Sequence, residues 1–191
     1  MEYLITYLPI ILAWLIFGLM HSILASRLMK DKLNLGPLTY RRLYNVFSIF
    51  AVLFIFFLGA TLPAEYLFVK DQVSKSIGLI IATFGFLLAK LAFRPISLSE
   101  FLGIKSETNQ KLIKDGIYAR IRHPLYSALI LGLIGFLIFS PTYTNLVHVI
   151  CILFYLFIGI YFEEKRLKNF FGQEYDDYKK QTPMLFPTLR K

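Results

Sequence analysis

The sequence is poor in the residues that build disulfide frameworks and metal sites. Its single cysteine, Cys151, lies inside an apolar run and has no second thiol with which to form a disulfide. A disulfide scaffold is therefore excluded, and the chain offers no cysteine and histidine spacing that is recognisable as a zinc site. We expect no metal in this protein.

Charged residues are also scarce. They make up 17% of the 191 residues, whereas a typical soluble domain carries about 25%. Apolar residues make up 57% of the chain, and the mean hydropathy is +0.59. This composition excludes an ordinary soluble domain and indicates a chain whose solvent is lipid.

Acidic residues are outnumbered by basic ones. The chain has 12 Asp and Glu against 21 Lys and Arg, for a formal charge of +9. An excess of cations can indicate nucleic-acid binding, but here the cations lie in short segments between apolar runs, as in membrane proteins. We expect no nucleic-acid partner. No Lys or Arg precedes the first apolar run, which argues against a cleaved signal peptide.

Five apolar runs predict membrane helices. They cover residues 3–20 (continuing to 24), 44–62, 77–93, 125–140 and 145–162. The fourth run reaches only ~24 Å as a helix, and an uncharged turn at 141–144 separates it from the fifth, so the last two predict a tight helical hairpin. The predicted fold class is an all-α polytopic membrane protein with about five transmembrane helices.

The distribution of cations predicts the orientation. Segments 27–42, 94–122 and 165–191 hold five, six and seven of the Lys and Arg residues. Five spans place all three on one side, so the positive-inside rule predicts an outside amino terminus and a cytoplasmic carboxyl terminus. We expect a loop at 27–42, and a cytoplasmic helix followed by an extended strap over 163–191.

We interpret the whole chain, 1–191, as one integral-membrane domain, with three helices in 1–96 and a second half in 97–191. Charged residues lie at both ends of the predicted hairpin, from Arg120 to Tyr126 and from Glu163 to Arg166. Such a mixed cluster can bind a zwitterion at a membrane boundary. The alternative is a set of ordinary cytoplasmic anchors. Glu163 and Glu164 lie ~100° apart on a helix, so at most one points straight into a pocket.

A series of motifs in the carboxyl-terminal half carries a family resemblance. In chain order they are Leu112 to Tyr118, Arg122-His123-Pro124-Leu125-Tyr126, Glu163-Glu164 with Leu167, Phe171 to Tyr175 with Tyr178, and Pro183 with Pro187. This series resembles the isoprenylcysteine carboxyl methyltransferase and phospholipid methyltransferase group of integral-membrane enzymes. The amino-terminal half, with 17–26, Tyr40-Arg41 and Tyr44-Asn45, looks like the subgroup that includes methanethiol S-methyltransferase and the denitrification-associated membrane proteins.

The resemblance implies S-adenosylmethionine bound between the last two membrane helices and the tail. The residues that it implies for the cofactor pocket are Gly116, Tyr118, His123, Pro124 and Tyr126, with Glu163 or Glu164 holding the polar groups. Arg122 is a candidate for orienting an anionic acceptor. His21 is a candidate base or hydrogen-bond partner of the acceptor, the alternative being an interfacial histidine bonded to backbone or to Ser22. We expect His148 to be structural.

The predicted function is methyl transfer to a small or lipophilic acceptor, which is a prenylcysteine-like carboxylate, a thiol or a lipid amine. One alternative is an NADPH-dependent membrane reductase of the sterol reductase type. That group has Asn before its motif tyrosine, where this chain has Leu125. The other alternative is a non-catalytic lipid-binding membrane protein.

Overall fold

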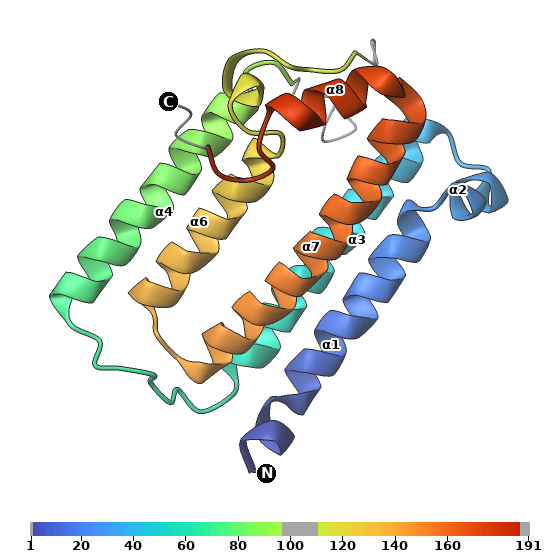
Figure 1. Cartoon of the computed structure of the whole chain (residues 1–191). Helices are drawn as coiled ribbons and strands as arrows, with labels where there is room; N and C mark the ends of the chain where they lie inside the picture. The colour runs from blue at the N-terminus through green and yellow to red at the C-terminus, as the bar shows by residue number, and fades with distance from the viewer. Residues whose placement is uncertain (1, 97–110, 188–191) are drawn as a thin grey trace. The chain divides into compact units, whose positions relative to one another are not determined.

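The computed structural model describes residues 2–96 and 111–187, and regular structure in these ranges is helical. The elements, shown in Figure 1, are α1 (Glu2–Ala25), α2 (Arg27–Leu33), α3 (Pro37–Ala60), α4 (Gln72–Ala92), the 3₁₀ turn η1 (Gly116–Ala119), α6 (Pro124–Phe139), α7 (Tyr143–Phe171) and α8 (Gln173–Gln181). An isolated antiparallel bridge joins Tyr66 to Thr142. The all-α prediction is confirmed, while residues 97–110 of the basic segment 94–122 lie outside the described residues.

Four helices of the described chain are long and apolar enough to cross a membrane. They are α1, from Ile5 to Ala25, and the whole of α3, α4 and α7. The fifth predicted span is α6, which is apolar but has only 16 residues. The protein is thus a polytopic membrane protein, and the expectation that its fourth span is short holds.

The described chain folds into two compact units that interleave along the sequence. Unit 1 contains residues 2–69 and 141–152, and unit 2 contains 70–96, 111–140 and 153–187. Helix α7 therefore contributes its first part to unit 1 and its later part to unit 2. Helix α4, which we assigned to the first half of the chain, groups with the second half.

Unit 1 is centred on the packing of α1 against α3 and the first part of α7. One cluster of buried apolar side chains there consists of Tyr7, Ile10, Trp14, Phe17 and Ile55. The indole Nε1 of Trp14 donates to Nδ1 of His148 over 2.9 Å. A Cβ built on Gly59 would lie 2.2 Å from Nε2 of His148, so glycine is needed for the imidazole to fit there. These contacts agree with the structural role that we expected for His148.

Unit 2 is built on close packing of α4 against α6. A Cβ added to Gly135 would lie 2.6 Å from both the Ala82 nitrogen and the Gly78 oxygen, so the two backbones are in direct contact. Small residues permit this approach between apolar helices, where van der Waals packing replaces the hydrophobic effect. The later part of α7 packs on α6 through Ile130, Leu156 and Ile160, as expected for the last two apolar helices.

Two predicted boundaries were wrong for local reasons. The expected loop at 27–42 is mostly helical, because the Ser26 hydroxyl caps α2 by accepting from the Met29 nitrogen and Pro37 starts α3 at a first-turn position. Helix α7 continues past residue 162 to Phe171. Gly172 follows the helix with a positive φ of +55°, which favours glycine, and α8 begins at the next residue. The predicted tail is thus the end of α7, a separate helix and the strap, residues 182–187.

Candidate functional site

The strap, residues 182–187, is joined to the start of α6 by hydrogen bonds. The backbone N–H of Arg122 donates to the Pro183 oxygen over 2.9 Å, and that of His123 to the Met184 oxygen over 3.0 Å. The hydroxyl of Ser127, which is 1% exposed, donates to the Leu185 oxygen over 2.5 Å. This extended pairing fixes the strap in unit 2, beside the motif that begins at Arg122.

Tyrosines anchor the turn before this motif. The Tyr178 hydroxyl donates to the Tyr118 oxygen over 2.6 Å, and the Tyr118 hydroxyl donates to the Ala92 oxygen over 3.3 Å. Burial raises the pKa of Tyr178 to about 12, so this hydroxyl keeps its proton and remains a donor. Gly116 begins the turn with a φ of +63°, which glycine adopts without strain.

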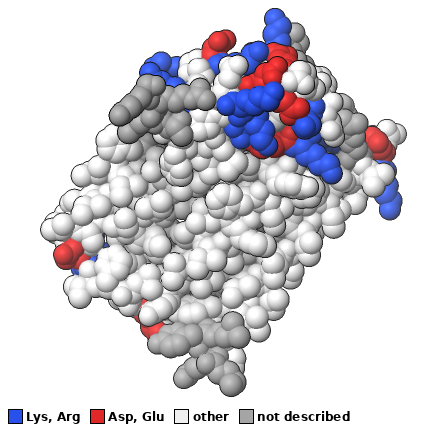
Figure 2. Space-filling model, in the orientation of Figure 1, with Lys and Arg blue, Asp and Glu red and all other residues white. Residues whose placement is uncertain are grey.

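A buried ion pair holds the strap to α7. Nη2 of Arg122 lies 2.6 Å from Oε1 of Glu164, and Nε of Arg122 donates to the same oxygen over 3.1 Å. The other guanidinium nitrogen donates to the backbone oxygens of Lys179 and Thr182. The side chains of Arg122 and Glu164 are only 7% and 14% exposed. Figure 2 shows charges of both signs gathered over α8.

The two adjacent glutamates have different surroundings. Oε2 of Glu164 is 2.6 Å from Nζ of Lys179, so both of its oxygens are engaged in this cluster. Glu163 is 32% exposed, and the part of the chain that the structure describes gives it no Lys or Arg partner. Its carboxylate lies 3.9 Å from Nδ1 of His123. Both carboxylate oxygens of Glu164 are therefore paired, whereas the carboxylate of Glu163 remains partly accessible.

His123 stands between these two carboxylates. Its Nε2 lies 3.3 Å from Oε1 of Glu164, and its ring centroid is 5.6 Å from that of Tyr126. Burial lowers the pKa of His123, and the charge of Glu163 opposes that shift without reversing it. Neutral His123 thus lies beside both Glu163 and Tyr126 in unit 2, and Pro124 is fully buried at the start of α6.

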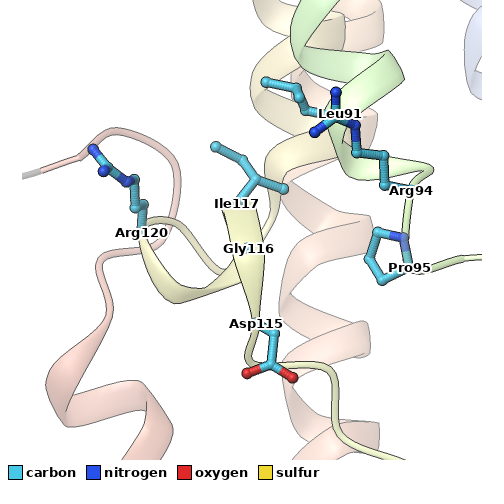
Figure 3. A pocket seen from close by; sticks show the side chains of 7 residues that line it. All are labelled: Leu91, Arg94, Pro95, Asp115, Gly116, Ile117 and Arg120. Carbon is cyan, nitrogen blue, oxygen red and sulfur yellow. The ribbon is translucent and has the colours of Figure 1, made fainter.

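Gly116 faces a different feature of unit 2, an open hollow of about 640 Å³. The residues that line it, drawn in Figure 3, are Leu91, Arg94, Pro95, Asp115, Gly116, Ile117 and Arg120. The other predicted cofactor residues do not line this hollow, and Tyr118 is buried in packing instead. The predicted set therefore falls into two groups.

His21 lies in unit 1, in a hydrogen-bonded cluster with Tyr44 and Ser48. Its Nδ1 is 3.0 Å from Oγ of Ser48, and its Nε2 is 2.5 Å from the Tyr44 hydroxyl. The Ser48 hydroxyl donates its proton to the Tyr44 backbone oxygen over 2.7 Å, so it accepts from Nδ1 of His21. Nε2 then accepts from the Tyr44 hydroxyl. The role of His21 toward an acceptor stays a prediction.

Sequence reasoning missed Ser48, Ser127, Lys179 and Thr182. The spacing of Tyr44 and Ser48, one helical turn apart, was the available signal for the first. The contacts of Ser127, Lys179 and Thr182 involve the chain after Gly172, so they depend on the direction that the tail takes at that glycine. Within the described residues no group of His, Cys, Asp and Glu is placed to hold a metal ion.

Comparison with known proteins agrees with the motif series. A family model described as phospholipid methyltransferase matches residues 73–174, which is more than half of the chain. The chain belongs to the phospholipid methyltransferase family. The matched region includes nearly all of α4, the Arg122-His123-Pro124 motif, both glutamates and the start of α8, and it confirms the family that the carboxyl-terminal motifs predicted.

Relatives in this family include methyltransferases of two kinds. Methanethiol S-methyltransferase 1 of Bradyrhizobium diazoefficiens is 28% identical over 92% of this chain and 65% of its own length. Methanethiol S-methyltransferase of Crocosphaera subtropica is 27% identical over 92% of this chain and 72% of its own length. Protein-S-isoprenylcysteine O-methyltransferase B of Arabidopsis thaliana is 28% identical over 59% of this chain and 58% of its own length. No solved structure matches the chain significantly.

Proposed function

We propose that this protein is an S-adenosylmethionine-dependent methyltransferase of the membrane. The single observation that carries the proposal is the arrangement around the motif of the family match, where a buried Arg122–Glu164 pair holds the strap next to His123 and the accessible Glu163. The names of the relatives support the reaction class, and nothing in these matches favours a reductase.

The residues present fit the cofactor. S-adenosylmethionine, when bound, supplies a methyl group on a cationic sulfonium and carries an ammonium and a carboxylate. Glu163 offers a partly exposed carboxylate for the cationic groups, and neutral His123 and Tyr126 beside it add polar atoms without positive charge. We assign cofactor contact to Glu163, His123, Pro124 and Tyr126, and leave Gly116 and Tyr118 as supports of the preceding turn.

We assign Glu164 and Arg122 to positioning. Glu164 already binds Arg122 and Lys179, and the Arg122 guanidinium bonds two backbone oxygens at the start of the strap. In this proposal Arg122 orders the strap instead of orienting an anionic acceptor. An ordered strap with buried Thr182 and Leu185 excludes water. A water-poor site accelerates a methyl transfer in which opposite charges are neutralised. Alignment of the methyl donor with the acceptor accelerates the reaction further.

We propose an apolar thiol or a prenylcysteine-like carboxylate as the acceptor. The relatives that cover 92% of this chain are named for methanethiol, and those that match its carboxyl-terminal part are named for protein S-isoprenylcysteine. Since the chain covers 65% of the length of the Bradyrhizobium relative, the acceptor is a proposal for this chain. Assays of methyl transfer to methanethiol and to a farnesylcysteine analogue distinguish the two classes.

Calorimetric titration of the detergent-purified protein with S-adenosylmethionine, S-adenosylhomocysteine and NADPH tests the proposal. We expect the adenosyl compounds to bind and NADPH not to. Glu163→Gln should weaken their binding about tenfold or more, as expected when a charge-assisted hydrogen bond is lost, and should leave the melting temperature near that of the parent. Glu164→Gln should lower the melting temperature, because it leaves Arg122 buried without its partner at a cost of roughly 3 kcal/mol.

Glu174→Gln is the matched control. Glu174 is an exposed carboxylate that pairs with Lys114 at the surface, so its loss should change neither affinity nor stability appreciably. Binding of NADPH in place of the adenosyl compounds would move the protein to the reductases. Binding of none of the three would favour the non-catalytic lipid-binding alternative. Either result overturns the proposal.

A further inference from the structure

The hollow beside η1 presents two guanidinium groups that the proposed reaction does not use. In Figure 3 the side chain of Arg94 folds back toward Leu91, and that of Arg120 rises on the other side of Ile117. Asp115 is the acidic residue that lines the hollow, and its carboxylate points in the opposite direction. The two guanidinium groups thus lie on opposite sides of the apolar Ile117 side chain.

The position of Arg94 on the chain places it at the edge of a membrane. The candidate membrane span of α4 ends at Ala92, and Arg94 follows two residues later, just past the end of the helix. Its side chain returns toward Leu91. A guanidinium at this level lies among lipid headgroups, while Leu91 borders the hydrocarbon.

Neither of these arginines is neutralised within the described part of the chain, where every ion pair of a Lys or Arg involves other residues. Arg122 shows the contrast, since it is buried and paired with Glu164. Two forked guanidinium groups bind the oxygens of a phosphate better than lysines do, because each offers two parallel donors. Charge complementarity therefore selects an anionic headgroup for this hollow.

We propose that the hollow of Arg94 and Arg120 binds the phosphate of an anionic membrane phospholipid. The guanidinium groups on either side of Ile117 supply the positive charge that attracts the phosphate, and Leu91 and Ile117 contact the apolar part of the lipid where it enters the hollow. This site is separate from the residues assigned to the cofactor. The inference goes beyond the proposed methyl transfer and does not depend on it.

Native mass spectrometry of the full chain tests this site. The purified protein is incubated with equal amounts of phosphatidylglycerol and phosphatidylcholine that have the same acyl chains, and retained lipid is measured. We expect preferential retention of phosphatidylglycerol. The Arg94→Gln, Arg120→Gln variant should reduce that preference by about 25-fold, since each basic residue near a headgroup surface contributes roughly a factor of five.

The control is Lys111→Gln, Lys165→Gln, which removes the same charge at exposed positions that do not line the hollow. It should keep the preference. The proposal is overturned if the arginine variant retains phosphatidylglycerol like the parent, or if the control loses as much. It is also overturned if inorganic phosphate displaces the lipid, which would indicate a soluble anion. Equal loss of S-adenosylhomocysteine binding in the arginine variant would instead make the hollow part of the cofactor site.

Discussion

At the scale of single residues, His123 makes stability depend on pH. Its folded-state pKa is lowered by burial, so the folded protein holds it neutral while the unfolded chain binds a proton near its ordinary pKa. The stability that such a group contributes is fully present above its pKa in the unfolded chain. It is lost as the pH falls through its lower pKa in the folded protein. Acid therefore favours the unfolded state through this residue.

We predict that the melting temperature of the parent falls more steeply from pH 7 to pH 5 than that of His123→Gln. Glutamine keeps a polar side chain of similar length but cannot take up the proton. Melting curves in detergent across this range measure the difference in slope. Parallel curves for the two proteins would show that protonation of His123 does not contribute.

The residue scale is also where sequence reasoning was most and least informative. The motifs placed His123 and the two glutamates in one region, because a motif before one helix and a motif late in the next meet when the hairpin closes. They did not separate Glu163 from Glu164. That difference comes from Lys179 and the strap, and their positions depend on the positive-φ turn at Gly172, which spacing along the chain does not reveal.

At the scale of elements, the contact between α4 and α6 depends on glycine. We predict that Gly135→Ala destabilises the protein, because the added Cβ would lie 2.6 Å from backbone atoms of Gly78 and Ala82 that cannot move independently of α4. Overpacking of this kind costs about 1–3 kcal/mol. Thermal unfolding in detergent measures it.

Gly132→Ala is the control on the same helix, where an added Cβ meets nothing within 4 Å. This substitution should be neutral or slightly stabilising, since alanine favours a helix over glycine. Equal effects of the two substitutions would mean that helix propensity, and not the close contact, decides the outcome.

The apolar runs predicted that the helices exist, but they did not predict which helices pack against one another. In a membrane, side chains that face lipid and side chains that face another helix are both apolar, so the pattern that reveals a core face in a soluble protein is lost. The pairing of α4 with α6 was signalled instead by small residues, Gly78 and Gly85 on one helix and Gly135 on the other. The first loop was wrong because Ser26 and Pro37 start helices that hydropathy does not detect.

At the scale of the whole molecule, the predicted orientation is open to direct test. In a Cys151→Ala background, we expect a cysteine at Val69 to react with an impermeant maleimide in intact cells. Cysteines at Lys32 and Lys180 should react only after permeabilisation, because basic segments stay in the cytoplasm. Val69 is 83% exposed, so its labelling is not limited by burial.

This experiment also tests whether the short helix α6 crosses. If α3, α4, α6 and α7 all cross, positions 32 and 180 lie on the same side. Labelling of the two positions from opposite sides would show that one of these helices does not cross the membrane. Helix α6 is the first one to suspect, because it is the shortest. The reverse pattern at all three positions would invert the predicted orientation.

The hydrogen bond between Trp14 and His148 has a spectroscopic consequence. Trp14 is the one tryptophan of the sequence, so the indole fluorescence of this protein comes from unit 1. Circular dichroism, by contrast, records the helices of both units. If the fluorescence and dichroism transitions coincide on heating, the units unfold together. If the two transitions occur at different temperatures, the fluorescence of this single indole reports the temperature at which unit 1 unfolds, without any added label.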